Sequence, residues 1–374
     1  MQPNIISLRD VKDEKEVVAL CVETLRKGRL VVFPTETVYG LAALASDAEA
    51  VKRLCVEKGR RAGHALPVAI SGYKTLKRYV PNAPRLALRL ASRFWPGPLT
   101  LVLDACAPDG ELNNLPEQSR KAIMPEGTVG FRTPKNAFLL RVLQVLDEPV
   151  VLTSANLSGE SPATSAAEAR DALGEKPELI IDDGESSFGH PSTVLRVCGK
   201  EATILREGAI PESKIRQAMA KVIVFVCTGN TCRSPMAEVI CQKLLAERLG
   251  IPIAELEKNG YVVLSAGVAA QNFCPASAQA CQVVSQEYGL SLNDHASRLF
   301  DPTLVQIADV VFTMTNSHKE ALLRFFPELY DRVYVLREDG LDIADPFGAP
   351  ASKYLSCAKQ IENQIRRRLP ELLD

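Results

Sequence analysis

Cys227 and Arg233 are spaced so that together they could handle a phosphoryl group. They lie in Val226-Cys-Thr-Gly-Asn-Thr-Cys-Arg-Ser-Pro235, between an apolar run typical of a strand and a segment typical of a helix. A loop in this position turns successive N–H groups inward, and the helix N-terminus adds positive charge, which suits phosphoryl oxygens and stabilises a thiolate. We therefore expect Cys227 to be a nucleophile and Arg233 to bind two phosphoryl oxygens through its planar guanidinium.

Transfer of a phosphoryl group to sulfur also requires a proton for the leaving atom. Asp345, in Leu341-Asp-Ile-Ala-Asp345-Pro346, is the candidate general acid. It would then act as a base on the water that hydrolyses the phosphocysteine. Asp301-Pro302 is a rival on the dipeptide alone, so the residues by themselves leave both aspartates open.

Cations and small polar loops in the N-terminal half suggest a second anion site. Residues 51–100 carry eleven Lys or Arg against one acid, and Lys58 and Arg60 in this run could grip a triphosphate. Two loops rich in small polar residues, at 34–41 and 153–159, follow strand-like runs. These residues alone indicate either an anion- or nucleotide-binding domain or solvated surface charge.

Strand-like runs alternate with helical stretches throughout the chain, which predicts α/β architecture. In the N-terminal part we expect strands at 30–33, 66–71, 99–103, 128–132, 149–153, 179–182, 193–197 and 203–206. We expect helices there at 47–57, at 83–94 with a stop at Pro96-Gly-Pro98, and at 211–221.

From Val222 onward the alternation becomes more regular. Strands are expected at 222–226, 261–264, 309–313 and 332–336, and helices at 234–249, 276–288, 317–325 and 351–370. This pattern fits a small doubly wound parallel sheet. We therefore expect two α/β domains, residues 1–218 and 219–374, joined by a connection too short for a flexible tether.

Composition places the protein among ordinary globular chains, with 374 residues, 46% of them hydrophobic, and a formal net charge of −1. No apolar run approaches bilayer-spanning length and the N-terminus lacks a signal-peptide pattern, so we expect a cytoplasmic protein without a membrane partner. The ten cysteines are scattered and include no pair of Cys-x-x-Cys motifs. We therefore expect reduced thiols and no metal held by protein ligands.

Residues 222–374 resemble the low-molecular-weight protein phosphatase family through the cysteine loop, Ser265-Ala-Gly267 after the second strand, and the late Asp-Pro. The resemblance implies that Asp345, rather than Asp301, supplies the acid. It implies that Asn230 shapes the loop and that Ser234 donates a hydrogen bond to the thiolate. Gly229 would permit close approach of the backbone, and the other residues that support the phosphate loop would be Thr228, Thr231 and Cys232. No cofactor is implied for this unit, whose partners would be phosphorylated proteins.

Thr231 bears on the substrate. Family members that act on phosphotyrosine usually carry a bulky aliphatic residue at this position and aromatic residues after the Asp-Pro, whereas this chain has Thr231 and Phe347-Gly348. Both features resemble the protein-arginine phosphatase branch, because a hydroxyl suits a polar guanidinium and an apolar residue suits a phenyl ring. We therefore favour phosphoarginine over phosphotyrosine as the substrate.

Two further points concern the cysteines of this unit. An arsenate-reducing branch of the scaffold uses extra downstream cysteines, and this chain has none between residues 282 and 356, which disfavours that activity. Cys232 could form a reversible disulfide that protects Cys227 from over-oxidation, or could simply pack within the loop.

Residues from about 10 to 215 resemble the threonylcarbamoyl-AMP synthase family. Six motifs in the family's order carry the resemblance: Pro34-Thr-Glu-Thr-Val-Tyr-Gly-Leu41, Lys58-Gly-Arg60, Trp95-Pro-Gly-Pro-Leu-Thr100, Ser154-Ala-Asn156, Pro191-Ser-Thr193 and Leu205-Arg-Glu-Gly208. It implies synthesis of threonylcarbamoyl-AMP from L-threonine, bicarbonate and ATP with Mg²⁺. The product serves to modify an adenosine in transfer RNA, so tRNA or tRNA-modification proteins are expected partners.

The same resemblance assigns roles to residues of this domain. Lys58 and Arg60 would hold ATP phosphates, and the nucleotide site would be completed by Ser154, Asn156 and Arg206. The threonine pocket would include Thr37, Arg132 and Ser192, with the guanidinium of Arg132 suited to the carboxylate of the amino acid. Positioning and charge neutralisation by these cations and Mg²⁺ would promote the phosphoryl chemistry.

Departures from the family pattern lie beside the expected ATP site. Arg61 and His64-Ala-Leu66 stand where many relatives have Pro and Lys-Pro-Leu, and Ala69 stands where some have His. Two hypotheses therefore remain. The chain is either a bifunctional enzyme, or a phosphatase whose N-terminal unit binds nucleotide or RNA without catalysis.

Overall fold

The computed structural model describes residues 3–59 and 65–373. Its contacts divide the chain into two compact units, Met1–Ala218 and Met219–Asp374. Each unit has its own sheet and its own buried core. Helices and strands are interspersed in both, which confirms the α/β class predicted from the sequence.

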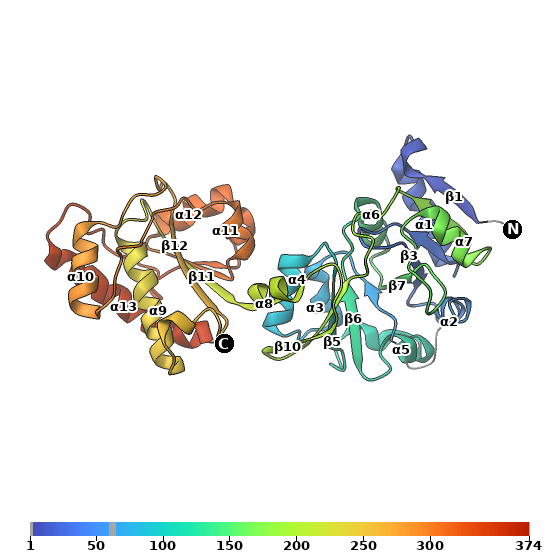
Figure 1. Cartoon of the computed structure of the whole chain (residues 1–374), viewed down its shortest axis with the longest axis horizontal. Helices are drawn as coiled ribbons and strands as arrows, with labels where there is room; N and C mark the ends of the chain where they lie inside the picture. The colour runs from blue at the N-terminus through green and yellow to red at the C-terminus, as the bar shows by residue number, and fades with distance from the viewer. Residues whose placement is uncertain (1–2, 60–64, 374) are drawn as a thin grey trace. The chain divides into compact units, whose positions relative to one another are not determined.

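A mixed sheet forms the frame of the first unit (Figure 1). Within the described residues its strands run across the sheet in the order β1-β8-β2-β3-β7-β4-β6-β5-β9-β10. Their bounds are β1 Asn4–Ser7, β2 Val31–Phe33, β3 Gly40–Leu44, β4 Val68–Ala69, β5 Leu99–Asp104, β6 Thr128–Arg132, β7 Val150–Ser154, β8 Leu179–Asp182, β9 Thr193–Cys198 and β10 Glu201–Arg206.

The helices of the first unit surround this sheet. Their bounds are α1 Glu14–Arg26, α2 Ala48–Glu57, α3 Leu76–Tyr79, α4 Arg85–Phe94, α5 Glu117–Ile123, α6 Ala137–Leu146, α7 Ala166–Leu173 and α8 Glu212–Met219. Helices α1 and α6 pack together against β2, β3 and β8 through one apolar cluster, which includes Cys21, Leu25, Phe33, Leu139 and Ile181. Burial of such side chains is the main favourable contribution to folding of this region.

Most predicted elements of this unit are present, with ends shifted by one or two residues. The strand expected at 66–71 is reduced to β4, Val68–Ala69, because Pro67 has no N–H with which to extend the pairing. The sequence did not predict β3, whose small side chains in Gly-Leu-Ala-Ala-Leu do not favour a strand over a helix. Helix α4 ends at Phe94, directly before the cis Trp95–Pro96 bond.

Four parallel strands of the second unit, among the residues described, pair in the order β12-β11-β13-β14. Their bounds are β11 Lys221–Cys227, β12 Tyr261–Gly267, β13 Val310–Thr313 and β14 Val333–Val335. The helices are α9 Arg233–Leu249, α10 Ala278–Tyr288, α11 Pro302–Ile307, α12 Asn316–Phe325 and α13 Ala351–Leu373. This is the doubly wound parallel sheet that the alternation predicts, with α11 as an additional short helix.

Both faces of β11 are buried. Ile223 and Phe225 face a core shared with α9, α10 and α13, whereas Val222, Val224 and Val226 face a core shared with α11 and α12. The chain leaves β11 toward β12 on one side and later returns to β13 on its other side. The carboxyl end of β11, where Cys227 lies, is therefore the topological switch point, the usual ligand site of such sheets.

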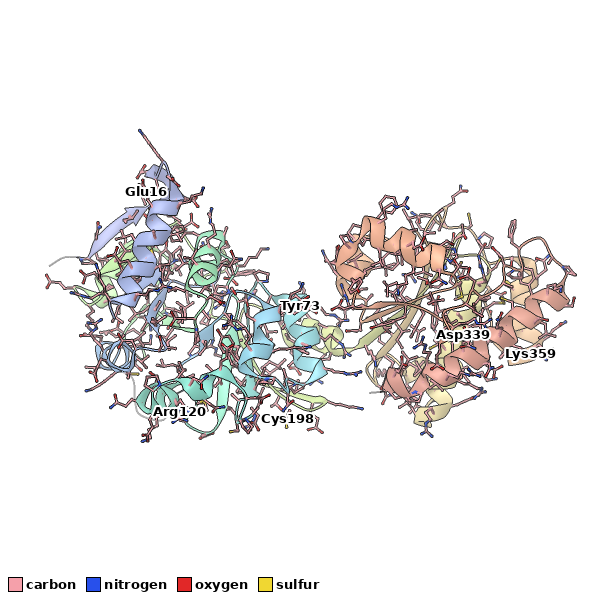
Figure 2. All side chains as sticks on the ribbon, turned by 180° about the vertical axis from the view of Figure 1, so that it is seen from behind. Glu16, Tyr73, Arg120, Cys198, Asp339 and Lys359 are labelled. Carbon is pink, nitrogen blue, oxygen red and sulfur yellow. The ribbon has the colours of Figure 1, made fainter. Side chains whose placement is uncertain are left out.

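The surfaces of both units carry charged side chains. Figure 2 labels Glu16 on α1 in the first unit and Asp339 and Lys359 in the second, all of which are exposed. Across residues 3–59 and 65–373, no helix is long and apolar enough to cross a bilayer. None of the ten cysteines, all of which lie in these ranges, forms a disulfide.

Candidate active sites

The cysteine loop of the second unit joins the central strand to a helix. Cys227 is the last residue of β11, and α9 begins at Arg233, so only five residues connect them. The Cys227 side chain is buried, and its Sγ lies 2.9 Å from the hydroxyl of Ser234 in the first turn of α9. The structure thus brings together the two residues for which a thiolate hydrogen bond is expected.

Asn230 holds this loop in shape. Its φ of 56° lies in the left-handed region, which asparagine tolerates better than most residues. Its side-chain amide donates to Ser234 Oγ at 3.0 Å and to Ser265 Oγ at 2.8 Å, while its Oδ1 accepts from the amide of Arg298 at 2.9 Å. The side chain is fully buried, so each of these bonds replaces water that the loop excludes.

A half-buried carboxylate, that of Glu238, lies behind this network. Ser265 donates to Glu238 Oε2 at 2.5 Å, and burial raises the pKa of Glu238 above its usual range. Because Asn230 already donates to the hydroxyl of Ser265, that hydroxyl directs its own proton to Glu238. Hydrogen bonds therefore link the Cys227 thiol to Glu238 through Ser234, Asn230 and Ser265. In the last two of these bonds, Asn230 donates to Ser265 and Ser265 donates to Glu238.

Arg233 meets the candidate acid. Its guanidinium is 5% exposed, donates to the Ile343 carbonyl at 3.1 Å, and forms an ion pair with Asp345 Oδ2 at 2.6 Å. The Asp345 side chain is 49% exposed, so it can exchange a proton with solvent or substrate. Asp301, the rival aspartate, instead caps α11 by accepting from the amide of Leu304 at 3.0 Å.

The remaining loop side chains face different neighbours. The hydroxyl of Thr231 lies 3.6 Å from the thiol of Cys232, and that buried thiol lies 3.3 Å from both Ser277 Oγ and the Tyr354 hydroxyl. The hydroxyl of Thr228 lies 2.9 Å from the ring of His318. Cys232 is therefore packed among hydroxyls, while Thr228 is tied to a different element of the fold.

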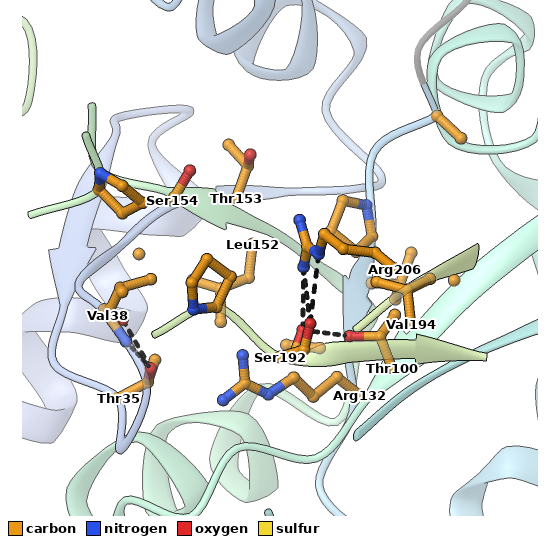
Figure 3. Close-up of a pocket in the computed structure, with 18 of the residues that line it drawn as sticks. Thr35, Val38, Thr100, Arg132, Leu152, Thr153, Ser154, Ser192, Val194 and Arg206 are labelled. Atoms are coloured by element: carbon orange, nitrogen blue, oxygen red, sulfur yellow. Dashed lines mark hydrogen bonds between the residues drawn. The ribbon is translucent and has the colours of Figure 1, made fainter. Parts of the chain in front are cut away.

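A cavity of about 530 Å³ opens in the first unit (Figure 3). Strands β3 to β7, β9 and β10 contribute residues to its walls, and apolar side chains such as Val38, Leu152 and Val194 form part of them. Of the residues expected to bind ligands, those that line it are Arg132, Ser154, Asn156, Ser192 and Arg206. None of the described lining residues comes from α4, so the basic residues of that helix lie elsewhere.

Arg132 is held in this cavity from three directions. Its Nη2 donates to Thr37 Oγ1 at 2.7 Å and lies 3.0 Å from Glu36 Oε1, while its Nε donates to the Gly97 carbonyl at 3.3 Å. Burial lowers the pKa of the Arg132 guanidinium, and the charge of Glu36 opposes this effect. No residue in the described part of the chain accepts a bond from Nη1 of Arg132, so two donors remain for a ligand.

Arg206 lies on the other side of Ser192 in the same cavity (Figure 3). Its Nη2 donates to the Ser192 carbonyl at 2.9 Å, and the hydroxyl of Ser192 lies 2.8 Å from that of Thr100. Burial and the positive charge of Arg132 both lower the pKa of Arg206. Across the described ranges no carboxylate forms an ion pair with Arg206.

Lys58 lies behind the cavity wall. It is buried, and its Nζ donates to the carbonyls of Ser154 at 2.5 Å and Asn156 at 2.9 Å and also contacts the side chains of both residues. An ammonium has three donors, so these acceptors already occupy it. Arg60 lies outside the described residues, as does His64.

Comparisons with known proteins match the two units separately. Residues 23–208 match the family model described as "Telomere recombination", which covers Sua5, YciO and YrdC, and residues 222–373 match "Low molecular weight phosphotyrosine protein phosphatase". The threonylcarbamoyl-AMP synthase of Pyrococcus abyssi is 36% identical over 235 residues, 62% of this chain and 66% of that relative. The protein-arginine-phosphatase of Bacillus subtilis is 35% identical over 154 residues, 40% of this chain and 95% of that relative. The chain belongs to both families.

The matches to the synthase family differ in how much of each relative they cover. The chain spans 66% of the Pyrococcus abyssi synthase and 61% of its Bacillus subtilis counterpart, so these sequence matches leave part of each relative uncovered. A solved structure of a variant of Pyrococcus abyssi Sua5 matches with a TM-score of 0.52 and 29% identity, over 71% of this chain and 91% of that one. The two units are thus a synthase-family domain and a phosphatase-family domain, and both families are enzymes.

Several residues that shape these sites were not assigned by sequence reasoning. Glu36 lies within a motif that the sequence singles out, but only the fold places it against Arg132. Glu238 stands five residues after Arg233 on the same helix, and His318 follows β13. No local signal marks these side chains as buried partners of a site.

Gly267 is the residue at which the backbone of β12 comes close to the phosphatase loop. A Cβ at Gly229 would meet only Thr231 Oγ1, at 3.7 Å, whereas a Cβ at Gly267 would lie 2.4 Å from the Thr228 carbonyl and 3.0 Å from the Asn230 amide nitrogen. The backbone of β12 therefore touches the phosphatase loop directly, and any side chain at Gly267 would push the loop aside.

We expect Gly267→Ala to destabilise the second unit by about 1–3 kcal/mol, the usual cost of overpacking. Gly229→Ala, the matched control in the loop itself, should change stability by less than about 0.5 kcal/mol. Scanning calorimetry of the full chain measures both, as a shift in the midpoint of one transition. Equal midpoints for Gly267→Ala and the unaltered protein would contradict this account of the loop.

Proposed function

We propose that the second unit hydrolyses phosphorylated side chains of proteins through Cys227. The observation that carries the proposal is the Arg233–Asp345 pair beside the cysteine loop, because it places a cation for the phosphoryl group next to a carboxylate with access to solvent. A ligand phosphoryl group would compete with Asp345 for the guanidinium, which has a planar fork suited to two oxygens. Binding of substrate would thereby release Asp345 toward the leaving group.

The reaction proceeds in two steps, transfer of the phosphoryl group to sulfur and hydrolysis of the phosphocysteine. The Cys227 thiolate attacks phosphorus, the bond from phosphorus to the leaving nitrogen or oxygen breaks, and Asp345 gives its proton to that atom. Asp345 then takes a proton from water, which attacks the phosphocysteine, and inorganic phosphate departs with regeneration of the thiolate. Ser234, 2.9 Å from the sulfur, supports the anion in both steps.

Phosphoarginine is the substrate that we favour within this class. Within the described residues the Thr231 hydroxyl has one polar side-chain partner, the thiol of Cys232 at 3.6 Å, which is a weak interaction. The hydroxyl therefore has capacity to bond a polar guanidinium. Gly229 leaves open space next to it, since a Cβ there would contact only Thr231 Oγ1. A phenyl ring would leave this hydroxyl without a partner.

We expect Thr231→Ile to shift the preference between phosphoarginine and phosphotyrosine peptides by about tenfold toward phosphotyrosine, because the hydroxyl is replaced by apolar surface. The ratio of kcat/KM values for matched peptides measures this change. Cys227→Ser should abolish turnover of both peptides. The substrate assignment fails if the unaltered protein hydrolyses both equally or if the ratio does not move in Thr231→Ile.

For the first unit we propose synthesis of threonylcarbamoyl-AMP from L-threonine, bicarbonate and ATP. The supporting observation is the pair of guanidinium groups in one cavity, only one of which has a carboxylate partner. Arg132, balanced by Glu36, would bind the threonine carboxylate through Nη1. Arg206, which is unbalanced, would bind the phosphates of ATP. The apolar walls suit the adenine ring and the threonine methyl group.

Magnesium would enter this cavity as part of the ATP complex. Glu160 is the single carboxylate among the described lining residues, so the triphosphate oxygens would supply most of the ligands that Mg²⁺ requires. Lys58 would hold the Ser154–Asn156 loop in place and could reach a phosphate only by releasing one of its acceptors. The product would pass to enzymes that modify tRNA, and a cytoplasmic location agrees with this supply of substrates.

The alternative is a first unit that binds nucleotide or RNA without catalysis. The departures near residue 61 and at Ala69 are the features that favour it. ATP consumption that requires both threonine and bicarbonate supports the synthase. ATP binding without such consumption supports the alternative.

The two arginines provide a crossed test of the synthase assignment. We expect Arg206→Gln to raise the KM for ATP, and Arg132→Lys to raise the KM for threonine, each by about tenfold or more, because each removes charge-assisted bonds to one substrate. Lysine keeps a cation against Glu36, which limits the loss of stability. Phosphatase turnover by the same full-length variants is the folding control. A rise in the same constant for both variants would refute the division of roles.

A further inference from the structure

A buried histidine of the second unit is held between two threonine hydroxyls. His318 is 5% exposed, its Nδ1 lies 2.9 Å from Thr315 Oγ1, and its Nε2 lies 2.9 Å from Thr228 Oγ1. Thr228 follows the nucleophile Cys227 directly in the chain. The imidazole therefore connects α12 to the first residue of the phosphate loop.

Contacts at the start of α12 orient the ring of His318. Thr315 is the N-cap of α12, and its hydroxyl accepts from the backbone amide of His318 at 3.2 Å as well as contacting the ring. Met314 donates its amide to the Val226 carbonyl at 2.9 Å, which aligns the end of β13 with the end of β11. The capping residue and the nucleophile thus reach the same edge of the sheet, and each ring nitrogen of His318 has a hydroxyl partner there.

The backbone of Thr228 is fixed from the opposite side. Its carbonyl accepts from the amide of Ala269 at 3.0 Å, and Gly267 leaves no room for movement toward β12. The side chain of Thr228 is exposed except for its bond to His318. His318 is therefore the contact that holds this residue from the β13 side, while β12 holds it from the other.

The ring is neutral at ordinary pH. Burial lowers the pKa of His318 to about 4, and the positive charge of Arg233 acts in the same direction, against the opposing charges of Asp345 and Asp342. A neutral imidazole donates from one nitrogen and accepts at the other, which matches two hydroxyl partners. A second cation beside Arg233 would be unfavourable in this buried position.

We propose that His318 is a positioning residue of the phosphatase reaction, which acts through the hydroxyl of Thr228 to fix the first peptide groups after the nucleophile. The proposal rests on the phosphatase function given above. Because loop N–H groups stabilise both the thiolate and the transferring phosphoryl group, displacement of Thr228 weakens both.

Two measurements on the full-length protein test this role. The rate of iodoacetamide alkylation of Cys227 at neutral pH, followed by mass spectrometry of its peptide, reports the thiolate without any substrate. The inhibition constant for vanadate, with para-nitrophenyl phosphate as substrate, reports how well the loop binds a phosphoryl-like anion. Thr228→Val should slow alkylation and raise the vanadate constant, each by about tenfold, the upper range for one hydrogen bond.

Matched variants separate positioning from folding. Thr228→Ser keeps the hydroxyl and should stay within about twofold of the unaltered protein in both measurements. His318→Asn should reproduce Thr228→Val, and the double variant should be no worse than either, because both remove one interaction. Ser317→Ala, which removes an exposed hydroxyl 2.8 Å from Thr315 Oγ1, should leave both values unchanged.

A failure of the positioning role can be told apart from a failure of the phosphatase assignment. If His318→Asn and Thr228→Val lower the melting temperature but leave the alkylation rate and the vanadate constant unchanged, His318 is only structural and the proposal is overturned. Additive losses in the double variant would overturn it as well. If the unaltered protein turns over no phosphorylated substrate while alkylation still responds to Thr228→Val, the phosphatase assignment fails but the contact between His318 and the loop does not.

Discussion

Each proposed site depends on a buried guanidinium whose direction is set by a carboxylate. Arg233 is 5% exposed and pairs with Asp345, and Arg132 is 12% exposed and pairs with Glu36. A buried cation without a partner is costly, so each carboxylate stabilises its guanidinium while no ligand is bound. The rest of each site is arranged around the donors that these pairs leave available.

The two carboxylates differ in exposure, and this difference separates their roles. The side chain of Asp345 is 49% exposed, whereas that of Glu36 is 5% exposed. Asp345 can leave its arginine, take up a proton from water and return, as a general acid must. Glu36 also accepts a hydrogen bond from the backbone amide of Lys135 at 2.9 Å, and its side chain is almost fully shielded from solvent. It is suited to hold Arg132 still for a ligand.

Sequence reasoning recovers most of the second unit because its signals are local. Each strand is an apolar run and each long helix has a clear period, so bounds such as 351–370 differ from the observed Ala351–Leu373 by only a few residues. The first unit is harder, since its sheet is mixed and its strand order follows no simple progression along the chain. The short strand β4 and the small-residue strand β3 owe their conformation to neighbours that lie far away in sequence.

The sequence by itself was enough to identify the residues of the phosphate loop, because Cys227, Asn230, Arg233 and Ser234 lie within eight positions where a strand passes into a helix. It also singled out the polar loops at 34–41 and 153–159 of the first unit, and residues of both loops line the cavity. Only the tertiary structure decided which polar and charged side chains meet, since Asp345 is 112 residues from Arg233 and Thr37 is 95 residues from Arg132. The same holds for His318, 90 residues from Thr228, and for Gly267, whose backbone approaches the loop at Thr228 and Asn230. Such contacts depend on the order of strands in a sheet, and no short stretch of sequence encodes that order.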